Sequence, residues 1–340
     1  MKFLLAPIAW IYGFVVWLRN LLYDDHILHS TQVSIPTICV GNLAVGGTGK
    51  TPMAEYLISL LSSDYKVALL SRGYGRKTKG FRIANEHDTA QTIGDEPMQI
   101  HTHFPDIPVA VCADRVKGVK RLQQLYPDLQ CVILDDAYQH RKLRCGFYVL
   151  LTPYDCLYTN DHLLPWGRLR DLPNQSHRAN VVVVTKCPSQ MQPIDRRIVS
   201  NALHLASYQH LVYSSIGYAP IALNGTPLLV TGIANPLPLL EHLKAQCPDT
   251  ELLAFPDHHV FTKHDIAQIM HKAEQYSCVV TTEKDYMRLL QTPLVEQLGN
   301  KLHVLAIQTD LGIDKEAFDR QILLYVSENN RKLSTINCQL

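Results

Sequence analysis

The chain has 340 residues, enough for two domains, and its 46% apolar and 19% charged residues are typical of a folded globular protein. Its formal net charge of +1 gives no overall attraction to nucleic acid, so any anionic partner must be bound by local groups. The nine cysteines include no Cys-x-x-Cys pair, which argues against a zinc site or a disulfide framework.

The first predicted element is an apolar helix. No charge occurs in the 16 residues from Phe3 to Leu18, which as a helix span about 24 Å, less than the roughly 30 Å hydrocarbon core of a bilayer. No small-residue cleavage site follows, so we do not expect a signal peptide. One interpretation is a helix packed on the protein's own core. We favour a monotopic, membrane-associated helix within residues 1–28, because tryptophan and tyrosine rings suit a membrane interface.

Apolar runs then alternate with helical patterns. The expected strands are 37–40, 66–70, 109–112, 131–134, 147–151 and 181–185. The expected helices between them are 52–61, 96–103, 115–126 and 194–205. This alternation predicts an α/β fold with a mostly parallel sheet and helices on both faces, over residues 29–216. A second alternating set predicts a smaller α/β domain over residues 217–340, with a soft boundary because no linker-like tract separates the two.

A glycine-rich loop joins the first of these strands to the first helix. Its sequence is AVGGTGKT, and it matches the P-loop pattern at Gly49, Lys50 and Thr51, with Ala44 in place of the first glycine. Backbone amides of such a loop and the helix N-terminus bind phosphate, the lysine reaches the β- and γ-phosphates, and the threonine binds Mg²⁺. The sequence therefore predicts a P-loop NTPase-type fold and an ATP-binding loop formed by Ala44, Val45, Gly46, Gly47, Thr48, Gly49, Lys50 and Thr51.

Two carboxylates follow another apolar run. Asp135 and Asp136 come directly after residues 131–134. Two acids at the end of a buried strand repel one another unless a cation lies between them. Together with Thr51 they are the predicted Mg²⁺ ligands, although a solvated turn is the simpler alternative.

The motifs resemble those of a known family, the tetraacyldisaccharide 4'-kinases of lipid A biosynthesis. The resemblance extends over most of the chain, through the strings VGNLAVGGTGKTP, SRGYGRK, GDEP, DDAYQHRKLRC, LLPWGRLRD, FPDHHVFT and TEKD. Two positions depart from the family pattern, since Asp171 stands where Glu is expected and Ala137-Tyr138 stand where Gly-Phe is usual. Both departures are mild and leave the assignment standing.

The resemblance implies a reaction and a location. ATP, with Mg²⁺, would phosphorylate the 4'-hydroxyl of a tetraacyl glucosamine disaccharide 1-phosphate to give lipid IVA, by in-line transfer. The enzyme would act on the cytoplasmic face of the bacterial inner membrane, as a monotopic or peripheral protein. The expected partners are this lipid A precursor and the membrane lipid surface, with no nucleic acid and no obligate protein partner.

The resemblance also implies roles for individual residues. Asp95 is the candidate catalytic carboxylate, paired with His258 or the adjacent His259 from the second domain, and Lys50 is the third catalytic residue. A helix cap and a loop histidine are the simpler interpretations of Asp95 and His258. The expected substrate or phosphate contacts are Arg72, Tyr74, Arg76, Arg115, Gln139, His140, Arg170 and Asp171. The role of Thr282–Asp285 is left open.

The strongest alternative is a P-loop NTPase switch at the membrane, either a GTPase or a partitioning-type ATPase. The string VVVVTKCP is similar to the guanine-reading Asn-Lys-x-Asp pattern, but Thr185 replaces the Asn and Pro188 replaces the Asp. A non-enzymatic membrane scaffold is a third alternative, and it leaves Lys50 and the acid pair without a role.

Overall fold

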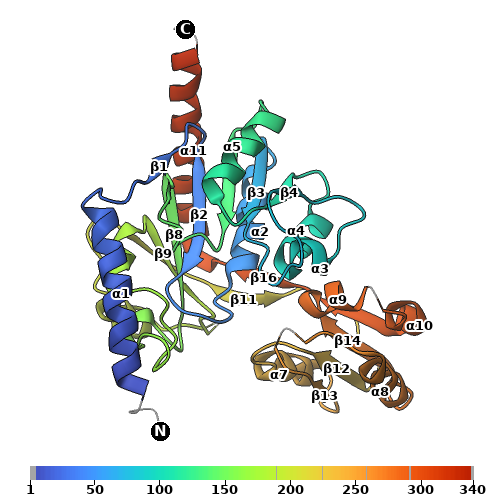
Figure 1. Ribbon diagram of the computed structural model, residues 1–340. Coiled ribbons are helices and arrows are strands. Elements are labelled where there is room, and N and C mark those ends of the chain that lie inside the picture. Colours follow the sequence, from blue (N-terminus) through green and yellow to red (C-terminus); the bar gives the residue numbers. More distant parts are fainter. Residues whose placement is uncertain (1–4, 189, 224, 258, 291, 338–340) are drawn as a thin grey trace.

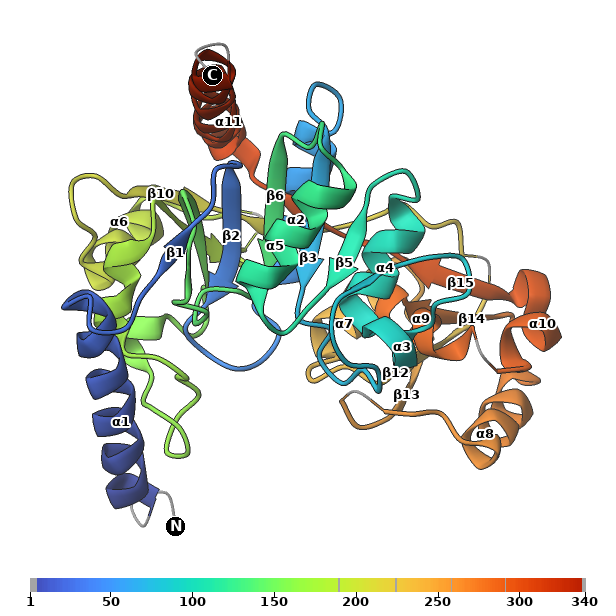
Figure 2. The same cartoon turned by 45° about the horizontal axis from the view of Figure 1, so that its top comes forward.

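Two α/β units of unequal size make up the protein (Figures 1 and 2). The computed structural model describes residues 5–188, 190–223, 225–257, 259–290 and 292–337. The larger unit carries the N-terminal helix and a long C-terminal helix, and the smaller unit lies beside it, below and to the right of the larger sheet in Figure 1. The predicted α/β class, with a P-loop-type parallel sheet, is confirmed.

The larger unit is built on an eight-stranded sheet of order β10-β9-β8-β2-β6-β3-β5-β4. Every neighbouring pair is parallel except β4 and β5. The central strands are buried on both faces, as expected for strands covered by helices on both sides. The eight strands of this sheet are β2 (Thr37–Asn42), β3 (Val67–Ser71), β4 (Arg82–Ile83), β5 (Val109–Val111), β6 (Cys131–Asp135), β8 (Phe147–Pro153), β9 (Val181–Thr185) and β10 (His210–Tyr213).

Helices cover both faces of this sheet. One face packs against α2 (Lys50–Leu61), α4 (Asp95–His103) and α11 (Lys315–Asn337). The other packs against α5 (Arg115–Leu125) and α6 (Pro193–Leu203). Smaller elements of this unit are β1 (Thr31–Gln32), which pairs with β7 (Leu143–Arg144), and α3 (Ala90–Ile93), η2 (Tyr158–Asn160), η3 (Pro173–Arg178) and η5 (Gly312–Asp314).

The smaller unit has its own parallel sheet, of order β13-β12-β14-β15. Separate apolar clusters fill its two faces, one under α7 and the other under α8 and α10. The bounds are β12 (Pro227–Thr231), α7 (Leu237–Gln246), β13 (Glu251–Ala254), α8 (Lys263–Ala273), β14 (Cys278–Thr282), α9 (Glu283–Leu289), α10 (Leu294–Leu298), η4 (Gly299–Lys301) and β15 (Leu302–Leu305).

The chain passes between the units twice, through one antiparallel strand pair. β11 (Ser215–Tyr218) leads into the smaller unit, and β16 (Ile307–Asp310) leads back beside it. The helix that follows, α11, buries Phe318, Ile322 and Val326 in the core of the larger sheet. The predicted range 217–340 for the smaller domain is therefore corrected at its end, because α11 belongs to the core of the larger unit.

The N-terminal helix α1 (Ala6–Asp24) lies along the outside of the larger unit, with one face packed and one face open (Figure 1). Ala9, Val16 and Asn20 are buried against the protein. Trp10, Ile11 and Phe14 on the open face are 72%, 67% and 60% exposed. Among the described residues, no helix has the length and apolar character that crossing a bilayer requires.

A polar junction also joins the units, between α4 and α9. The imidazole of His103 lies between two carboxylates, with Nδ1 3.0 Å from Glu55 Oε1 and Nε2 2.9 Å from Glu283 Oε1. Gln99 Nε2 donates to the same two carboxylates, at 3.0 and 3.3 Å. Ligand atoms of Glu55, His103 and Glu283 lie within 4.8 Å of one another, which is close enough to hold a metal ion. However, each carboxylate contacts a different ring nitrogen, which is the geometry of a doubly hydrogen-bonded imidazolium.

This junction predicts a pH-dependent contribution to stability. Hydrogen bonds to Glu283 and then to Glu55 raise the pKa of His103 from 6.5 to about 10. A raised folded-state pKa means that the stabilisation is complete below about pH 6.5 and is lost as the pH rises through about 10. We expect His103→Gln to lower Tm by about 2–6 °C at pH 6.5, and by much less at pH 10.5.

Differential scanning calorimetry at the two pH values measures this difference. His271→Gln, at an exposed histidine of α8, is the matched control and is expected to leave Tm unchanged at both. An equal loss of Tm at pH 6.5 and 10.5 would contradict a charged imidazole at the junction.

Candidate active site

The glycine-rich loop lies at the carboxyl edge of the larger sheet, where β2 ends and α2 begins. Gly46 and Gly49 have φ values of 107° and 88°, in the left-handed region that glycine adopts without steric cost. Lys50 is the first residue of α2, so its side chain and the helix N-terminus are presented at the same edge. The predicted strand, loop and helix are thus present in this order.

Neighbouring segments hold the loop in place. Asn42 Nδ2, at the end of β2, donates to Thr48 Oγ1 at 2.7 Å, and Thr185 Oγ1, at the end of β9, donates to the Thr48 carbonyl at 2.9 Å. The Val45 amide donates to the Arg168 carbonyl at 2.8 Å. These bonds fix both halves of the loop, which is the preorganisation that a phosphate site requires.

Asp136 faces the loop from the end of β6, with two cations beside it. Lys50 Nζ is 4.0 Å from its Oδ1, and Arg170 binds both of its carboxylate oxygens while also contacting Asn42 Oδ1. Burial favours the neutral acid, but Lys50 and Arg170 outweigh it and hold the pKa of Asp136 at about 2. Its φ of 48° is left-handed, a conformation that aspartate tolerates better than most residues.

Asp135 is almost completely buried, and no ion pair to its carboxylate occurs among the described residues, although the charges of Lys50 and Arg115 act on it from a distance. Burial, with the Asp136 charge second, raises the pKa of Asp135 to about 7. Ser71 Oγ donates to Oδ2 at 3.4 Å, whereas Oδ1 is buried without a hydrogen-bond partner among the described residues. An orphaned carboxylate oxygen beside a second carboxylate is a donor that Mg²⁺ prefers, and Thr51, in the first turn of α2, can add a hydroxyl. These residues therefore fit a magnesium ion.

Asp95 begins α4 and contacts the smaller unit. Arg288 of α9 donates to Asp95 Oδ2 from Nε at 2.9 Å and from Nη2 at 2.6 Å. The predicted partner His258 lies outside the described residues. The adjacent alternative, His259, has its Nε2 2.9 Å from Asp265 Oδ2 and stacks on Phe255, so its described contacts are within the smaller unit.

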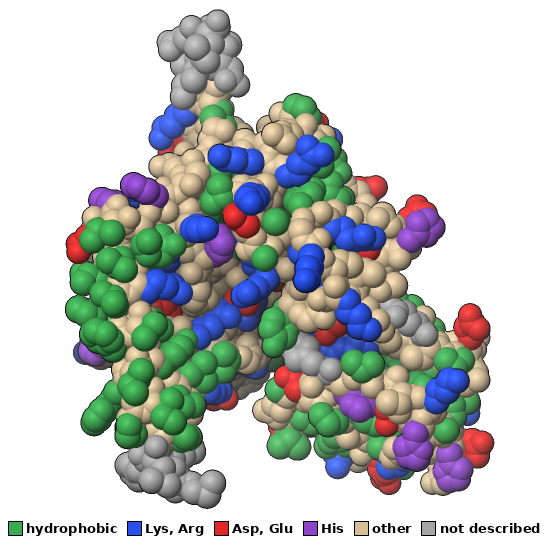
Figure 3. Space-filling model, viewed as in Figure 1, with side chains coloured by type: hydrophobic (Ala, Val, Ile, Leu, Met, Phe, Trp, Pro, Cys, Tyr) green, Lys and Arg blue, Asp and Glu red, His purple; other side chains and the backbone are tan. Residues whose placement is uncertain are grey.

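The basic loop after β3 forms one rim of this edge. Arg72, Tyr74 and Arg76 line a hollow of about 360 Å³. Arg72 and Tyr74 are exposed, whereas Arg76 donates to the Gly80 carbonyl at 2.6 Å and so stiffens the loop itself. Lys and Arg side chains gather in the middle of the face shown in Figure 3, between α1 and the smaller unit. This region suits an anionic substrate.

Three of the predicted phosphate contacts have partners inside the protein instead. Arg115 is 2% exposed and donates to the Cys112 carbonyl at 2.7 Å, so it fixes strand ends and is not presented to a substrate. Gln139 Nε2 donates to the Asn42 carbonyl at 2.8 Å. Burial and then the Arg115 charge lower the pKa of His140 to about 4, and its Nε2 accepts from the Arg115 amide, so the ring offers no cation to phosphate.

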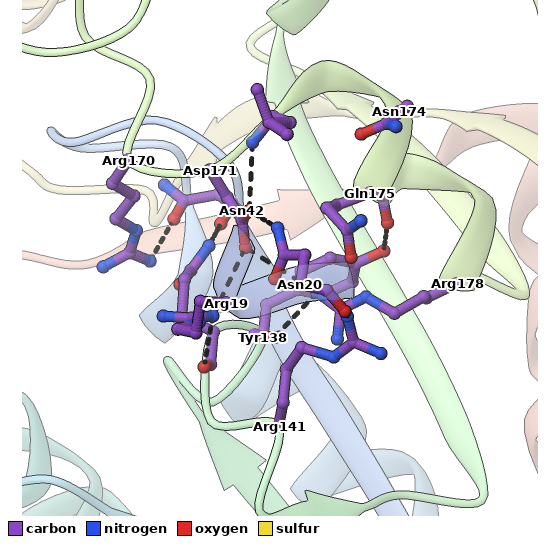
Figure 4. Close-up of polar contacts among 12 residues, drawn as sticks. Arg19, Asn20, Asn42, Tyr138, Arg141, Arg170, Asp171, Asn174, Gln175 and Arg178 are labelled. Atoms are coloured by element: carbon purple, nitrogen blue, oxygen red, sulfur yellow. Dashed lines mark hydrogen bonds and ion pairs between the residues drawn. The ribbon is translucent and has the colours of Figure 1, made fainter. Parts of the chain in front are cut away.

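Asp171 is likewise not a phosphate contact, because it joins α1 to the larger unit (Figure 4). It is completely buried and accepts from Asn20 Nδ2 at 2.7 Å. Arg19 and Arg178 approach its other oxygen at 3.9 and 4.0 Å. Arg170 precedes it, and the Tyr12 hydroxyl of α1 donates to the Arg170 carbonyl at 3.0 Å. Of these two consecutive residues, Arg170 binds Asp136 through its side chain, and Asp171 binds the N-terminal helix α1.

Two residues of the site, Asn42 and Arg288, were not predicted from the sequence. Asn42 contacts both the P-loop and Arg170, and its position directly before the loop is the only sequence signal for it. Arg288 contacts Asp95 across the junction, and its three-residue spacing from Asp285 is a weak sequence signal for an ion pair on one helix face.

Comparison with known proteins assigns the family. The model of the family described as tetraacyldisaccharide-1-P 4'-kinase matches residues 1–327. The chain belongs to this family. It is 43% identical over 359 aligned residues to a tetraacyldisaccharide 4'-kinase of Bacteroides thetaiotaomicron, with 97% of this chain and 94% of that protein covered. It is 44% identical over 338 residues to a tetraacyldisaccharide 4'-kinase of Flavobacterium johnsoniae, with 96% of this chain and 97% of that protein covered. The protein is thus a kinase of lipid A biosynthesis.

A solved structure has the same fold. It is described as the "apo" form of LpxK from Aquifex aeolicus in complex with ATP, and it matches with a TM-score of 0.72. The two chains are 24% identical, and the match covers 96% of this chain and 99% of that chain. The likeness shows that the two chains share a fold.

The geometry of the loop predicts the effect of Lys50→Ala. Lys50 is the loop side chain that can neutralise a transferring phosphoryl group, and loss of such a contact costs about 10²–10³ in rate. We expect kcat to fall by this factor while the thermal unfolding profile stays close to that of the wild type. Turnover near the wild-type value at saturating nucleotide would contradict the P-loop assignment.

Proposed function

We propose that the enzyme transfers the γ-phosphoryl group of ATP to the 4'-hydroxyl of a tetraacyl glucosamine disaccharide 1-phosphate, with Mg²⁺. The observation that carries this proposal is the loop with Lys50 facing Asp135 and Asp136 at one edge of the parallel sheet, in a chain of this family. The ATP named with the Aquifex aeolicus structure supports the choice of nucleotide.

Each part of this edge has a role in the transfer. The loop amides and Lys50 bind the phosphates, and Lys50 neutralises charge that develops on the transferring group. Asp135, together with Thr51, would hold Mg²⁺, which would supply further charge neutralisation, while Asp136 is bound by Lys50 and Arg170. Arg170 orients Asp136 by binding both of its oxygens. The protein thus contributes mainly positioning and preorganised charge.

We assign Asp95 as the group that accepts the proton of the 4'-hydroxyl. It begins α4, and Arg288 of α9 orients its carboxylate through two hydrogen bonds. Its pairing with His258 stays a prediction. His259 already contacts Asp265 within the smaller unit, and this contact supports His258 over His259 as the partner of Asp95.

The alternative of a nucleotide-dependent switch is less well supported. Thr185 stands at the position where a guanine-reading loop would have Asn, and its hydroxyl donates to the Thr48 carbonyl. This hydroxyl therefore supports the P-loop. The family match also extends through the smaller unit, which a simple switch does not need.

Transfer to lipid is tested with γ-labelled ATP, Mg²⁺ and the purified disaccharide 1-phosphate, followed by chromatography of the lipid. We expect label on the lipid with wild-type protein, about 10²–10³ times slower labelling with Lys50→Ala, and no label with a lipid already phosphorylated at the 4' position. Release of labelled phosphate without labelled lipid would contradict the proposal and favour the switch. Absence of nucleotide binding would favour a scaffold.

We further propose that α1 lies on the cytoplasmic surface of the inner membrane. Its open face carries large apolar side chains, and Figure 3 shows hydrophobic side chains along the edge of the molecule that α1 occupies. A contiguous exposed apolar surface of this kind is typical of membrane or protein contact. Its rings suit the interface between lipid headgroups and acyl chains. Docking through Asp171 places this surface next to the P-loop edge.

Substitution of the open face tests membrane binding without disturbing the packed face. We expect Trp10→Ser combined with Phe14→Ser to weaken flotation with phosphatidylethanolamine–phosphatidylglycerol vesicles at least about tenfold, and to raise KM for lipid more than KM for ATP. The matched control is Leu324→Ser on α11, where the leucine is 52% exposed. Unchanged flotation of the double variant would contradict a membrane role for α1.

A further inference from the structure

The helix α9 presents a fixed arginine to the larger unit. Arg288 has a side chain that is only 7% exposed, and it makes two hydrogen bonds to one oxygen of Asp95, from Nε at 2.9 Å and from Nη2 at 2.6 Å. Asp95 is on α4 of the larger unit, so the pair joins the two units at the start of that helix. Charge-assisted hydrogen bonds from a guanidinium orient a carboxylate strongly.

Arg288 is itself held from behind by Asp285. Its Nη1 donates to Asp285 Oδ1 at 2.9 Å. The other oxygen of Asp285, which is completely buried, accepts hydrogen bonds from the Thr231 hydroxyl at 2.7 Å, the Gly232 amide at 3.0 Å and the Thr282 hydroxyl at 2.8 Å. This carboxylate is therefore fixed by the ends of β12 and β14. The arrangement leaves Arg288 little freedom to turn away from Asp95.

We propose that Arg288 is a positioning residue for Asp95, supplied by the smaller unit and aimed by Asp285. The proposal rests on the proposed role of Asp95 as the acceptor of the hydroxyl proton. The two hydrogen bonds from the guanidinium fix the orientation of the carboxylate. This arrangement also gives a role to the Thr282–Asp285 motif: Thr282 caps α9, and Asp285 holds the arginine.

A neighbouring ion pair allows this role to be separated from simple adhesion between the units. Lys284 Nζ lies 2.9 Å from Glu96 Oε1, and it joins the same two helices, α9 and α4. Neither residue contacts Asp95 in the described interactions. If the charges at this junction served only to hold the units together, loss of either pair would have the same kind of effect.

The test compares Arg288→Gln, Arg288→Lys, Lys284→Gln, Asp95→Asn and the double variant Asp95→Asn/Arg288→Gln, with labelled ATP and the lipid disaccharide. We expect Arg288→Gln to lower kcat about 10- to 100-fold and to change KM for ATP less than about twofold. Arg288→Lys should recover part of kcat, because lysine keeps the charge but loses the paired geometry. Lys284→Gln should keep kcat within about twofold of the wild type.

The double variant decides whether Arg288 acts through Asp95. We expect it to be no slower than Asp95→Asn alone, because two groups that act as one unit are not additive. Two results would overturn the role of Arg288 but leave that of Asp95 intact. One is a multiplicative loss of kcat in the double variant, and the other is wild-type kcat in Arg288→Gln while Asp95→Asn is inactive. Full activity of Asp95→Asn would overturn both the proton acceptor and this proposal. If Arg288→Gln does not fold, wild-type kcat in Arg288→Lys likewise rejects the need for paired hydrogen bonds.

Discussion

Two adjacent carboxylates at the end of β6 must be neutralised where the sheet is buried, and much of the site follows from this constraint. Asp136 is neutralised within the protein by Lys50 and Arg170, and its pKa stays low. Asp135 forms no ion pair within the described part of the chain, and burial raises its pKa. The pair therefore divides into one carboxylate that orders the loop and one that is suited to a metal ion. This asymmetry is a physical reason for two acids where one metal ligand would suffice.

The segment containing Arg170 and Asp171 connects this edge to the outside of the molecule. Arg170 contacts Asp136 and Asn42, and the next residue is buried against α1. Two consecutive residues thus connect the apolar helix α1 to the carboxylate that faces the P-loop. The smaller unit completes the edge from the opposite side, through α9.

Local patterns predicted the parts of the protein that local sequence determines. The strand, glycine loop and helix around Lys50 were predicted because turn, charge and periodicity occur within one short segment. Contacts between distant segments have no such signal. Asn20 and Asp171 are 151 residues apart, and Asp95 and Arg288 are 193 apart. The return of α11 to the larger sheet was missed for the same reason, since its apolar face indicates burial but not the partner. Arg115 shows the converse error, because a charged residue after a strand can be buried and structural.

Direct metal binding tests the division of roles between the two carboxylates. Mn²⁺ binding in the presence of a non-hydrolysable ATP analogue can be followed by electron paramagnetic resonance, in the wild type and in Asp135→Asn. We expect a tightly bound Mn²⁺ in the wild type and a loss of affinity of at least about tenfold in Asp135→Asn. Equal Mn²⁺ affinity in the two proteins, with the nucleotide still bound, would contradict the assignment of Asp135 as the metal ligand.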